Sequence, residues 1–443
     1  MNIQINKFLI ALITLIYSVQ FLSQAQTKVS INTSDSLSLN QIISEVIKSH
    51  PSVQQAAEAL NAADAKIDLA KSGYLPNVNF DASYDRLGPA SSIAFPGLGN
   101  FSLYPLNNYN ASINVQQTVY DFGKTSKNIN VEKENKVLAE QTLEQVKQKL
   151  AMSATTNFYS LLYLQEAIRI KDEQLHTLKE HLDYIEKKKE TGSATSYEIL
   201  TTKVKISTVE SQKIDLEAAL NIQLAVLNNL LGAPEKTSHI VKTELTSILS
   251  NIPTDSLSKY AMSHRDEMLI AKEKTTIAQM RYKMIKTQYN PVINLMAVGG
   301  EKNGFFPDMN KMTANFVAGI NLKIPIFDAS RTKFNLRQAN SYIQSSNFET
   351  EITRRTITNE VMENEANRLA ALKKVKQFEL QLTQAQQALG LATISFKAGS
   401  ITNLDLLDAS TSVSESRLYL LKSKIDYMLS VYKLKMTLGQ KLY

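Results

Sequence analysis

Residues 109–120 read YNASINVQQTVY, and the alternation within this stretch decides what kind of fold the chain can adopt. Tyrosine, alanine, isoleucine and valine alternate with asparagine, serine and glutamine, so an extended segment has one apolar face and one polar face. The next residues, DFGKTSKNINVEKENKVLAEQ (121–141), have instead the charged and apolar spacing of a helix. The sequence therefore predicts a two-faced strand that leads directly into a long helix.

Composition favours a folded protein built mostly from helices. The chain has 443 residues, of which 43% are hydrophobic, and it contains only 14 glycines and 10 prolines. It has no cysteine, and its five histidines are not at metal-ligand spacings, so we predict no metal site and no cofactor. The net charge of +7 is spread along the chain without a basic run, which argues against nucleic-acid binding. Because neither a phosphate-binding loop nor a nucleophile motif is present, we predict that the protein is not an enzyme.

The first 25 residues have the pattern of a secretory signal peptide. One lysine precedes a short apolar run, and small residues at positions 23 and 25 form the cleavage pattern. The apolar run is short for a membrane anchor, and no later stretch of 18 apolar residues follows. We therefore expect an exported protein that no helix anchors in a membrane.

The chain consists of two copies of one unit. Residues 113–122 (INVQQTVYDF) match residues 320–329 (INLKIPIFDA), and residues 191–200 (TGSATSYEIL) match residues 398–407 (AGSITNLDLL) at the same offset. The offset holds without a gap from residue 113 to residue 232, which chance does not readily produce. We therefore divide the chain into a signal peptide (1–25), a first repeat (26–232), a linker (233–254) and a second repeat (255–443).

Each repeat is predicted to contain the same elements in the same order. The first repeat is expected to have a helix at 51–72, strands at about 77–86 and 109–120 joined by a loop at 87–108, a long helix at 124–190, a tip turn at 191–196 and a return helix at 196–231. The second is expected to have a helix at about 256–288, strands at about 292–299 and 313–325, a long helix at 331–397, a tip turn at 398–402 and a return helix at 403–438. In both long helices the seam positions recur at steps of three and four, which is the spacing of a coiled coil.

The strands indicate a sheet that spans a membrane. Four strands of about ten residues with one apolar face suit tilted strands in a bilayer. Their open edges would leave backbone groups unpaired in hydrocarbon, at a cost of several kcal/mol each, whereas three chains supply twelve strands and can close a barrel with room inside. The residues expected to face the barrel lumen are Asn79, Asp81, Asn110, Ser112, Asn114 and Asn321. The competing interpretation is a water-soluble sheet on a helical body.

The chain resembles a known family, the TolC-type outer membrane efflux proteins. The resemblance covers nearly all residues after the signal peptide and rests on the duplicated unit and on several short motifs. These motifs are GYLP (73–76), VYDFGK (119–124), IPIFDAS (324–330) and the tip turns GSATSYEIL (192–200) and GSITNLDLL (399–407). The resemblance implies a mostly helical protein with a trimeric twelve-stranded outer-membrane β-barrel, four strands per chain, continuous with a long coiled-coil helical barrel in the periplasm of a Gram-negative bacterium.

The resemblance also implies a function, that of the outer-membrane exit duct of a tripartite efflux or type I secretion system. Such a duct is a passive homotrimeric channel in outer-membrane lipid. It docks through its helical tips to a periplasmic adaptor, or membrane fusion protein, which is linked to an inner-membrane pump of the RND or ABC type. The cargo stays open between drugs, metals, other small molecules and secreted proteins.

Several functional residues of the family can be placed in this sequence. Similar proteins narrow the periplasmic end with aspartate rings after the second tip turn, which implies a constriction at Asp405 and Asp408. The competing interpretation of Asp405 is a charge that complements the dipole at the start of a helix. The tip residues that the resemblance assigns to adaptor docking are Gly192, Ser193, Thr195, Glu198, Gly399, Ser400 and Thr402.

One feature departs from the family pattern. The type member latches its tip with an arginine and a tyrosine beside the second turn, where this chain has Ile401 and Phe396. We therefore expect closure of the tip to depend on apolar contacts. The alternative from another functional class is a periplasmic coiled-coil adaptor or adhesin that forms no channel.

Overall fold

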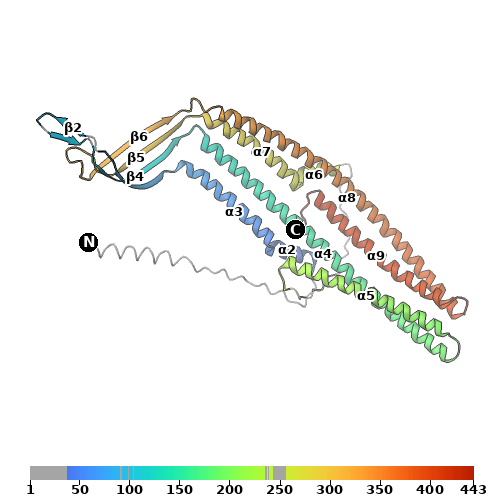
Figure 1. The fold of residues 1–443 in the computed structure, drawn as a ribbon. Helices are drawn as coiled ribbons and strands as arrows, with labels where there is room; N and C mark the ends of the chain where they lie inside the picture. The colour runs from blue at the N-terminus through green and yellow to red at the C-terminus, as the bar shows by residue number, and fades with distance from the viewer. Residues whose placement is uncertain are drawn as a thin grey trace, which may run out of the picture.

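The computed structural model shows an elongated molecule with an antiparallel sheet at one end and long helical hairpins at the other (Figure 1). The structure describes residues 37–89, 92–97, 99–102, 104–234, 237, 239–242 and 256–443. The predicted signal peptide and much of the predicted linker lie outside these residues. Among the helices that are described, none is long and apolar enough to cross a membrane.

Two strands from each repeat form the main sheet. They are β1 (Asn77–Arg86), β4 (Asn107–Tyr120), β5 (Val292–Lys302) and β6 (Thr313–Lys323), paired antiparallel in the order β1-β4-β5-β6. Phe80 lies opposite Ile113 on one face, and its neighbour Asn79 lies opposite Asn114 on the other. The apolar residues of β1 and β4 therefore lie on one face of the sheet, and their polar residues lie on the other face. Within the described part of the chain, the outer edges of β1 and β6 pair with no further strand.

A small hairpin extends from the far end of the sheet, where the sequence predicts only a loop. The region expected as a loop at 87–108 contains β2 (Ser92–Phe95) and β3 (Gly99–Ser102), which pair with each other. The turn between them includes Gly97, whose φ of 84° favours glycine. Pro96 and Gly97 lie in this turn, so the prediction of a loop is wrong for residues 92–95 and 99–102, which form strands.

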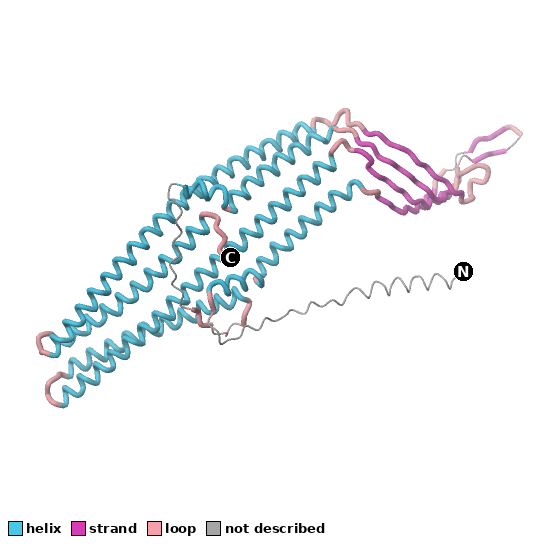
Figure 2. The backbone as a smooth tube through the Cα atoms, turned by 180° about the vertical axis from the view of Figure 1, so that it is seen from behind, coloured by secondary structure: helices cyan, strands magenta, loops and turns pink. Residues whose placement is uncertain are grey.

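Two helical hairpins extend from the sheet to the opposite end of the molecule (Figure 2). Each begins with a proline-free helix of 67 residues, α4 (Lys124–Glu190) or α8 (Arg331–Lys397), whose bounds are those expected from the sequence. The returning helices are α5 (Ser196–Leu231) and α9 (Asn403–Thr437). Helices α3 (Pro51–Lys71) and α7 (Asp266–Lys286) lie beside the sheet-proximal parts of α4 and α8. The order α3-α4-α7-α8 therefore repeats the order of the strands.

The opening helix of the second repeat differs from the prediction. The sequence predicts one helix at about 256–288, whereas the structure has α6 (Leu257–His264) and α7, separated at Arg265. Arg265 has an extended backbone, and its guanidinium pairs with Glu267 at 2.9 Å and with Glu360 on α8. Neither glycine nor proline marks the break in the sequence. The break coincides with a contact to Glu360 on a distant segment, and the first repeat has a matching break at His50 between α2 (Leu39–Ser49) and α3.

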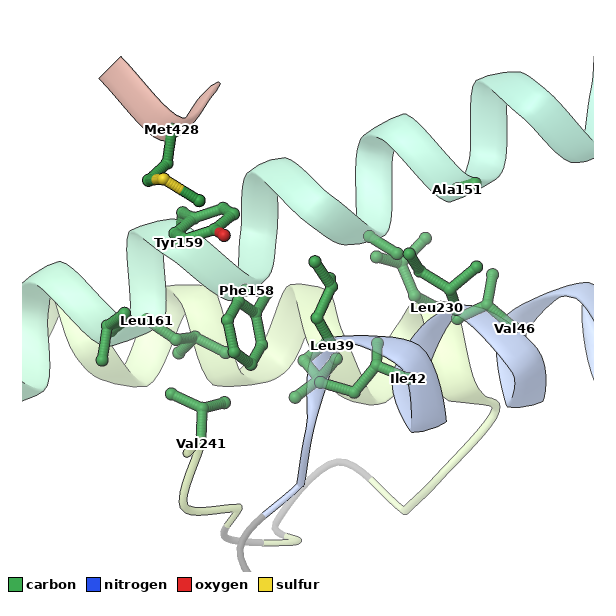
Figure 3. Packing of buried hydrophobic residues seen from close by; sticks show 14 of the residues in the cluster. Leu39, Ile42, Val46, Ala151, Phe158, Tyr159, Leu161, Leu230, Val241 and Met428 are labelled. Atoms are coloured by element: carbon green, nitrogen blue, oxygen red, sulfur yellow. The ribbon is translucent and has the colours of Figure 1, made fainter. Parts of the chain in front are cut away.

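The largest cluster of buried side chains lies at the middle of α4 and joins both repeats (Figure 3). Phe158 and Tyr159 of α4 are almost fully buried there. They belong to the same cluster as Leu230 of α5, Met428 of α9 and residues of α2 (Leu39–Ser49), a helix that was not predicted. Burying one large apolar side chain stabilises a fold by about 1.5–3 kcal/mol. The cluster therefore joins α2, the first hairpin and α9 of the second hairpin in one apolar core.

Candidate functional site

Both tip turns reverse the chain with the same backbone geometry. Gly192 and Gly399 have φ angles of 72° and 74°, in the left-handed region that strains other residues. The amides of Ser193 and Ser400 donate to carbonyl groups of the helices they leave, at 2.8 and 2.9 Å. All four residues are exposed at the end of the molecule farthest from the sheet. The turns predicted to dock an adaptor are therefore accessible.

Each returning helix begins with a capping box, in which side chain and backbone exchange hydrogen bonds. The amide of Thr195 donates to the Glu198 carboxylate at 2.7 Å, and the Glu198 amide donates to the Thr195 hydroxyl at 3.3 Å. Thr402 and Asp405 repeat the arrangement, with 2.9 Å from the Thr402 amide to Asp405 Oδ2. The hydrogen bonds from Thr402 lower the pKa of Asp405. Asp405 thus caps the start of α9 in the single chain, and its membership of a ring stays a prediction.

Asp408 lies one helical turn beyond Asp405 and is also exposed. Its side chain is 67% accessible, and Nζ of Lys205 on α5 lies 4.0 Å from Oδ1. This lysine was not predicted as part of the site. It would balance part of the negative charge of any ring that Asp408 contributes to.

A buried polar contact that the sequence did not predict joins the two hairpins at the tip. Asn403 is 3% exposed, and its amide nitrogen donates to Thr202 Oγ1 at 3.1 Å and to the Glu198 carbonyl at 3.3 Å. Its amide oxygen is 2.6 Å from Nε2 of His181 on α4, so Nε2 must carry the proton that this oxygen accepts. We call Asn403, His181 and Thr202 the tip junction. An asparagine directly after the capping threonine gave no signal that its side chain crosses to another hairpin.

Apolar contacts surround the tip junction. Leu407, one turn after Asn403, packs in a cluster with Leu178 and Ile206 of the first hairpin. Phe396 is 7% exposed, and its ring centre lies 5.6 Å from that of His181. Phe396 was expected to make apolar contacts. It packs against the ring of His181, and the hydrogen bond between His181 and Asn403 adds a polar contact beside it. Asn403 and Leu407 turn toward the first hairpin, whereas the two aspartates between and after them are exposed to solvent.

The predicted lumen residues share one face of the sheet. Asn114 donates a hydrogen bond to Asp81, and Asp81 lies opposite Ser112 in the β1–β4 pairing. Asn110 donates to the Ser112 hydroxyl at 3.4 Å. Asn321 belongs to the same face but lies on β6, opposite Asn294 of β5. The structure therefore brings together most of the predicted set on β1 and β4 and leaves Asn321 at the other edge of the sheet.

The polar face is interrupted by apolar residues in the second repeat. Asn114 lies opposite Val298, and Val298 lies opposite Val317. Gly300 is opposite Ser112, where a β-carbon would lie 2.1 Å from the Ala111 carbonyl oxygen, so glycine permits this close approach. The sequence did not predict this stripe of valine and glycine, because it follows from the register between strands of different repeats.

Among the residues that the structure describes, no three histidine, cysteine or acidic side chains gather in a group that could hold a metal ion. The geometry at the tips and on the polar face is that of exposed turns, helix caps and hydrogen-bonded amides. Such groups can contact a partner protein or line an aqueous passage.

Known proteins share both the sequence pattern and the fold. The profile of a family described as outer membrane efflux protein matches residues 42–233 and 257–440. The alkaline protease secretion protein AprF of Pseudomonas aeruginosa is 22% identical over 342 residues, which cover 75% of this chain and 70% of that protein. The outer membrane protein TolC of Escherichia coli is 20% identical over 423 residues, covering 90% and 82%. A solved structure of CusC superposes with a TM-score of 0.75 at 18% identity, covering 91% of this chain and 92% of that one. The chain therefore belongs to the outer membrane efflux protein family, whose members are non-enzymatic transport channels of the Gram-negative outer membrane.

Proposed function

We propose that three copies of this chain form a passive exit duct that works in a tripartite efflux or type I secretion system. The observation that carries the proposal is the sheet, which has an exposed apolar face and two unpaired edges in the described chain. On that face Phe80, Phe316 and Ile320 expose 69%, 83% and 75% of their surface. Lipid would cover these side chains, and pairing of β1 with β6 of a neighbouring copy would satisfy the edges.

Closure by three copies also accounts for the helices. Twelve strands leave room for an aqueous passage, which the eight strands of two copies would not. The order α3-α4-α7-α8 follows the order of the strands, so a closed ring of strands continues into a closed ring of helices. The passage would then extend from the membrane to the tips across the full length of the molecule.

The tips are the proposed docking site for a periplasmic adaptor, which would be linked to an inner-membrane pump of the RND or ABC type. The support is their exposure and the identical construction of the two turns. In the trimer, Asp405 and Asp408 would form two carboxylate rings at the periplasmic end and favour cations. The names of the relatives mention protease secretion for AprF and cation efflux for CusC, so both classes of cargo are candidates here.

The assembly can be tested on purified protein. Light scattering in detergent should give the mass of three chains, and the protein should require detergent for release from the cell envelope. A stable monomer extracted from membranes would contradict the proposed duct. Release by osmotic shock without detergent would instead favour a periplasmic coiled-coil protein that forms no channel.

The docking surface can be tested with single cysteines, because the chain has none of its own. Ser193→Cys and Ser400→Cys would place a thiol-reactive crosslinker at each tip in native membranes. Mass spectrometry should identify an adaptor crosslinked to both variants. Asn310→Cys, in the exposed loop between β5 and β6 at the opposite end, serves as the control and should give no adaptor. Failure of both tip variants to capture an adaptor, with normal labelling of the thiols, would refute docking through the tips.

A further inference from the structure

A groove between three helices lies near the sheet and has no part in the proposed duct. Helix α7 packs against α4 on one side and against α8 on the other, and side chains of all three helices line a hollow of about 310 Å³. Pockets of about 300–1,000 Å³ are of the size that binds small organic molecules. We call this hollow the α7 groove, and its principal lining residues are Leu138, Ile277, Arg281, Ile285, Ala339 and Tyr342.

The floor of the α7 groove is apolar. Ile277 of α7 and Ala339 of α8 expose only 4% and 5% of their surface, and the half-buried side chains of Leu138 and Ile285 line the groove beside them. Tyr342 of α8 also lines the groove but is 61% exposed, so it forms part of the rim. A ligand with an apolar or aromatic body would therefore remove apolar surface from water on this floor.

The charged side chains that line the α7 groove are positive. Lys274 and Arg281 lie on the same face of α7, two helical turns apart. Lys274 pairs with Glu349 at 2.6 Å, whereas exposed Arg281 has no ion pair or hydrogen bond in the part of the chain that the structure describes. None of the described residues that line the groove carries a carboxylate. Arg281 can therefore bind an anionic group without first losing a partner.

Polar contacts at both ends of the α7 groove hold its walls together. At one end, the ion pair between Lys274 and Glu349 joins α7 to α8. Beyond the other end, the Thr332 hydroxyl of α8 donates to Gln288 Oε1, just after α7, at 3.4 Å. The groove is therefore already formed in the folded chain, and a preformed site loses little free energy in ordering its walls around a ligand.

We infer that the α7 groove binds one small amphiphilic organic anion. The aromatic or aliphatic body of the ligand would lie on Ile277 and Ala339, and its carboxylate or sulfonate would accept hydrogen bonds from the Arg281 guanidinium. The volume of the groove is near the lower limit for ligand pockets, which suits a small molecule. Because all the lining residues belong to one chain, this inference does not rest on the proposed assembly.

Fluorescence can test the site, because the chain contains no tryptophan. Tyr342→Trp would place a single energy donor at the rim of the groove. The dye 8-anilinonaphthalene-1-sulfonate is an aromatic anion that accepts energy from tryptophan, and N-phenyl-1-naphthylamine is the same molecule without the sulfonate. For the purified protein in detergent, energy transfer should reveal one saturable site per chain for the sulfonate dye and weaker binding of the neutral dye. The signal of the protein without tryptophan is subtracted to remove the contribution of dye in micelles.

A matched pair of variants in α7 separates the groove from general charge. Arg281→Gln, in the Tyr342→Trp background, should weaken binding of the sulfonate dye by roughly tenfold or more, as expected for the loss of a charged hydrogen bond. The same variant should leave the affinity for the neutral dye unchanged. Lys283→Gln removes an exposed charge on the opposite side of α7, outside the groove, and should leave both affinities unchanged.

Three results would overturn the inference. In Arg281→Gln, an equal loss for both dyes or no loss for either would mean that the guanidinium does not bind the sulfonate. The same loss in Lys283→Gln would attribute binding to the general charge of the helix. Absence of saturable energy transfer from the tryptophan would mean that the groove does not hold the dye. None of these results bears on the proposed duct, which light scattering of the same protein tests separately.

Discussion

Replacing Asn403 with alanine should loosen the contact between the two helical hairpins at the tip. The substitution removes three hydrogen bonds at once, to Nε2 of His181 at 2.6 Å, to Thr202 Oγ1 at 3.1 Å and to the Glu198 carbonyl at 3.3 Å. One such bond contributes a net 0.5–1.5 kcal/mol, and a buried partner left unpaired adds a desolvation cost. Because Thr202 keeps its own bond to the Glu198 carbonyl at 2.7 Å, the expected total is about 2–3 kcal/mol.

Hydrogen exchange measures this loss at the tip. A change of about 2–3 kcal/mol raises the local opening equilibrium roughly 30- to 150-fold. Mass spectrometry of the Asn403→Ala assembly should show faster exchange by about this factor in peptides that cover residues 191–200 and 398–407. Peptides from the sheet should exchange as in the parent, because the perturbation lies at the other end of the molecule.

Asn364→Ala is the matched control. Asn364 on α8 donates to Thr437 Oγ1 on α9 at 2.8 Å, so it joins two helices of the same hairpin and makes no contact at the tip. Its tip peptides should exchange at the parental rate. The reasoning fails if Asn403→Ala leaves the tip unchanged, or if the control accelerates the tip to the same extent.

Three further predictions concern the membrane face, the constriction and the pH dependence of stability. Ile113→Lys should destabilise the inserted barrel by about 2–4 kcal/mol if the residue lies near the bilayer midplane, and should therefore reduce the amount of heat-stable trimer in outer membranes. Asn114→Lys, on the polar face, should be tolerated. Equal tolerance of the two variants would contradict the assigned faces. Asp405→Ala combined with Asp408→Ala should weaken cation selectivity and block by multivalent cations in planar bilayers while the trimer persists, and unchanged currents would leave both residues as helix-start charges. Burial, together with the neighbouring carboxyl group of Glu134, raises the pKa of Glu273 from 4.5 to about 7. The folded state then holds a proton that the unfolded chain releases, so this contribution to stability is greatest below pH 4.5 and is lost as pH rises through 7. Glu273→Gln should flatten the dependence of melting temperature on pH in this window, and an unaltered profile would exclude the carboxyl pair as its source.

The sequence by itself determined the four strands of the main sheet, the long helices and their order, but not α2 or the β2–β3 hairpin. The alternation of apolar and polar residues at 109–120 and the proline-free coiled-coil spacing at 124–190 are local patterns. They can therefore be recognised from the sequence without the structure. Gly192 and Gly399 marked the tip turns because few other residues tolerate a positive φ. The duplicated pattern then placed the same elements in the second repeat. Thr402 and Asp405 could also be recognised as the start of a helix, because a threonine followed three residues later by an acidic residue is a local capping pattern.

Only the tertiary structure decided how distant segments meet. The register of β4 against β5 placed Val298 opposite Asn114, so apolar residues of the second repeat continue the polar face of β1 and β4. The contacts of Asn403 with His181 and of Arg265 with Glu360 likewise join residues that are far apart along the chain. Local preferences repeat every few residues and are written in the sequence pattern, whereas register and packing between remote elements depend on the free energy of the whole folded chain.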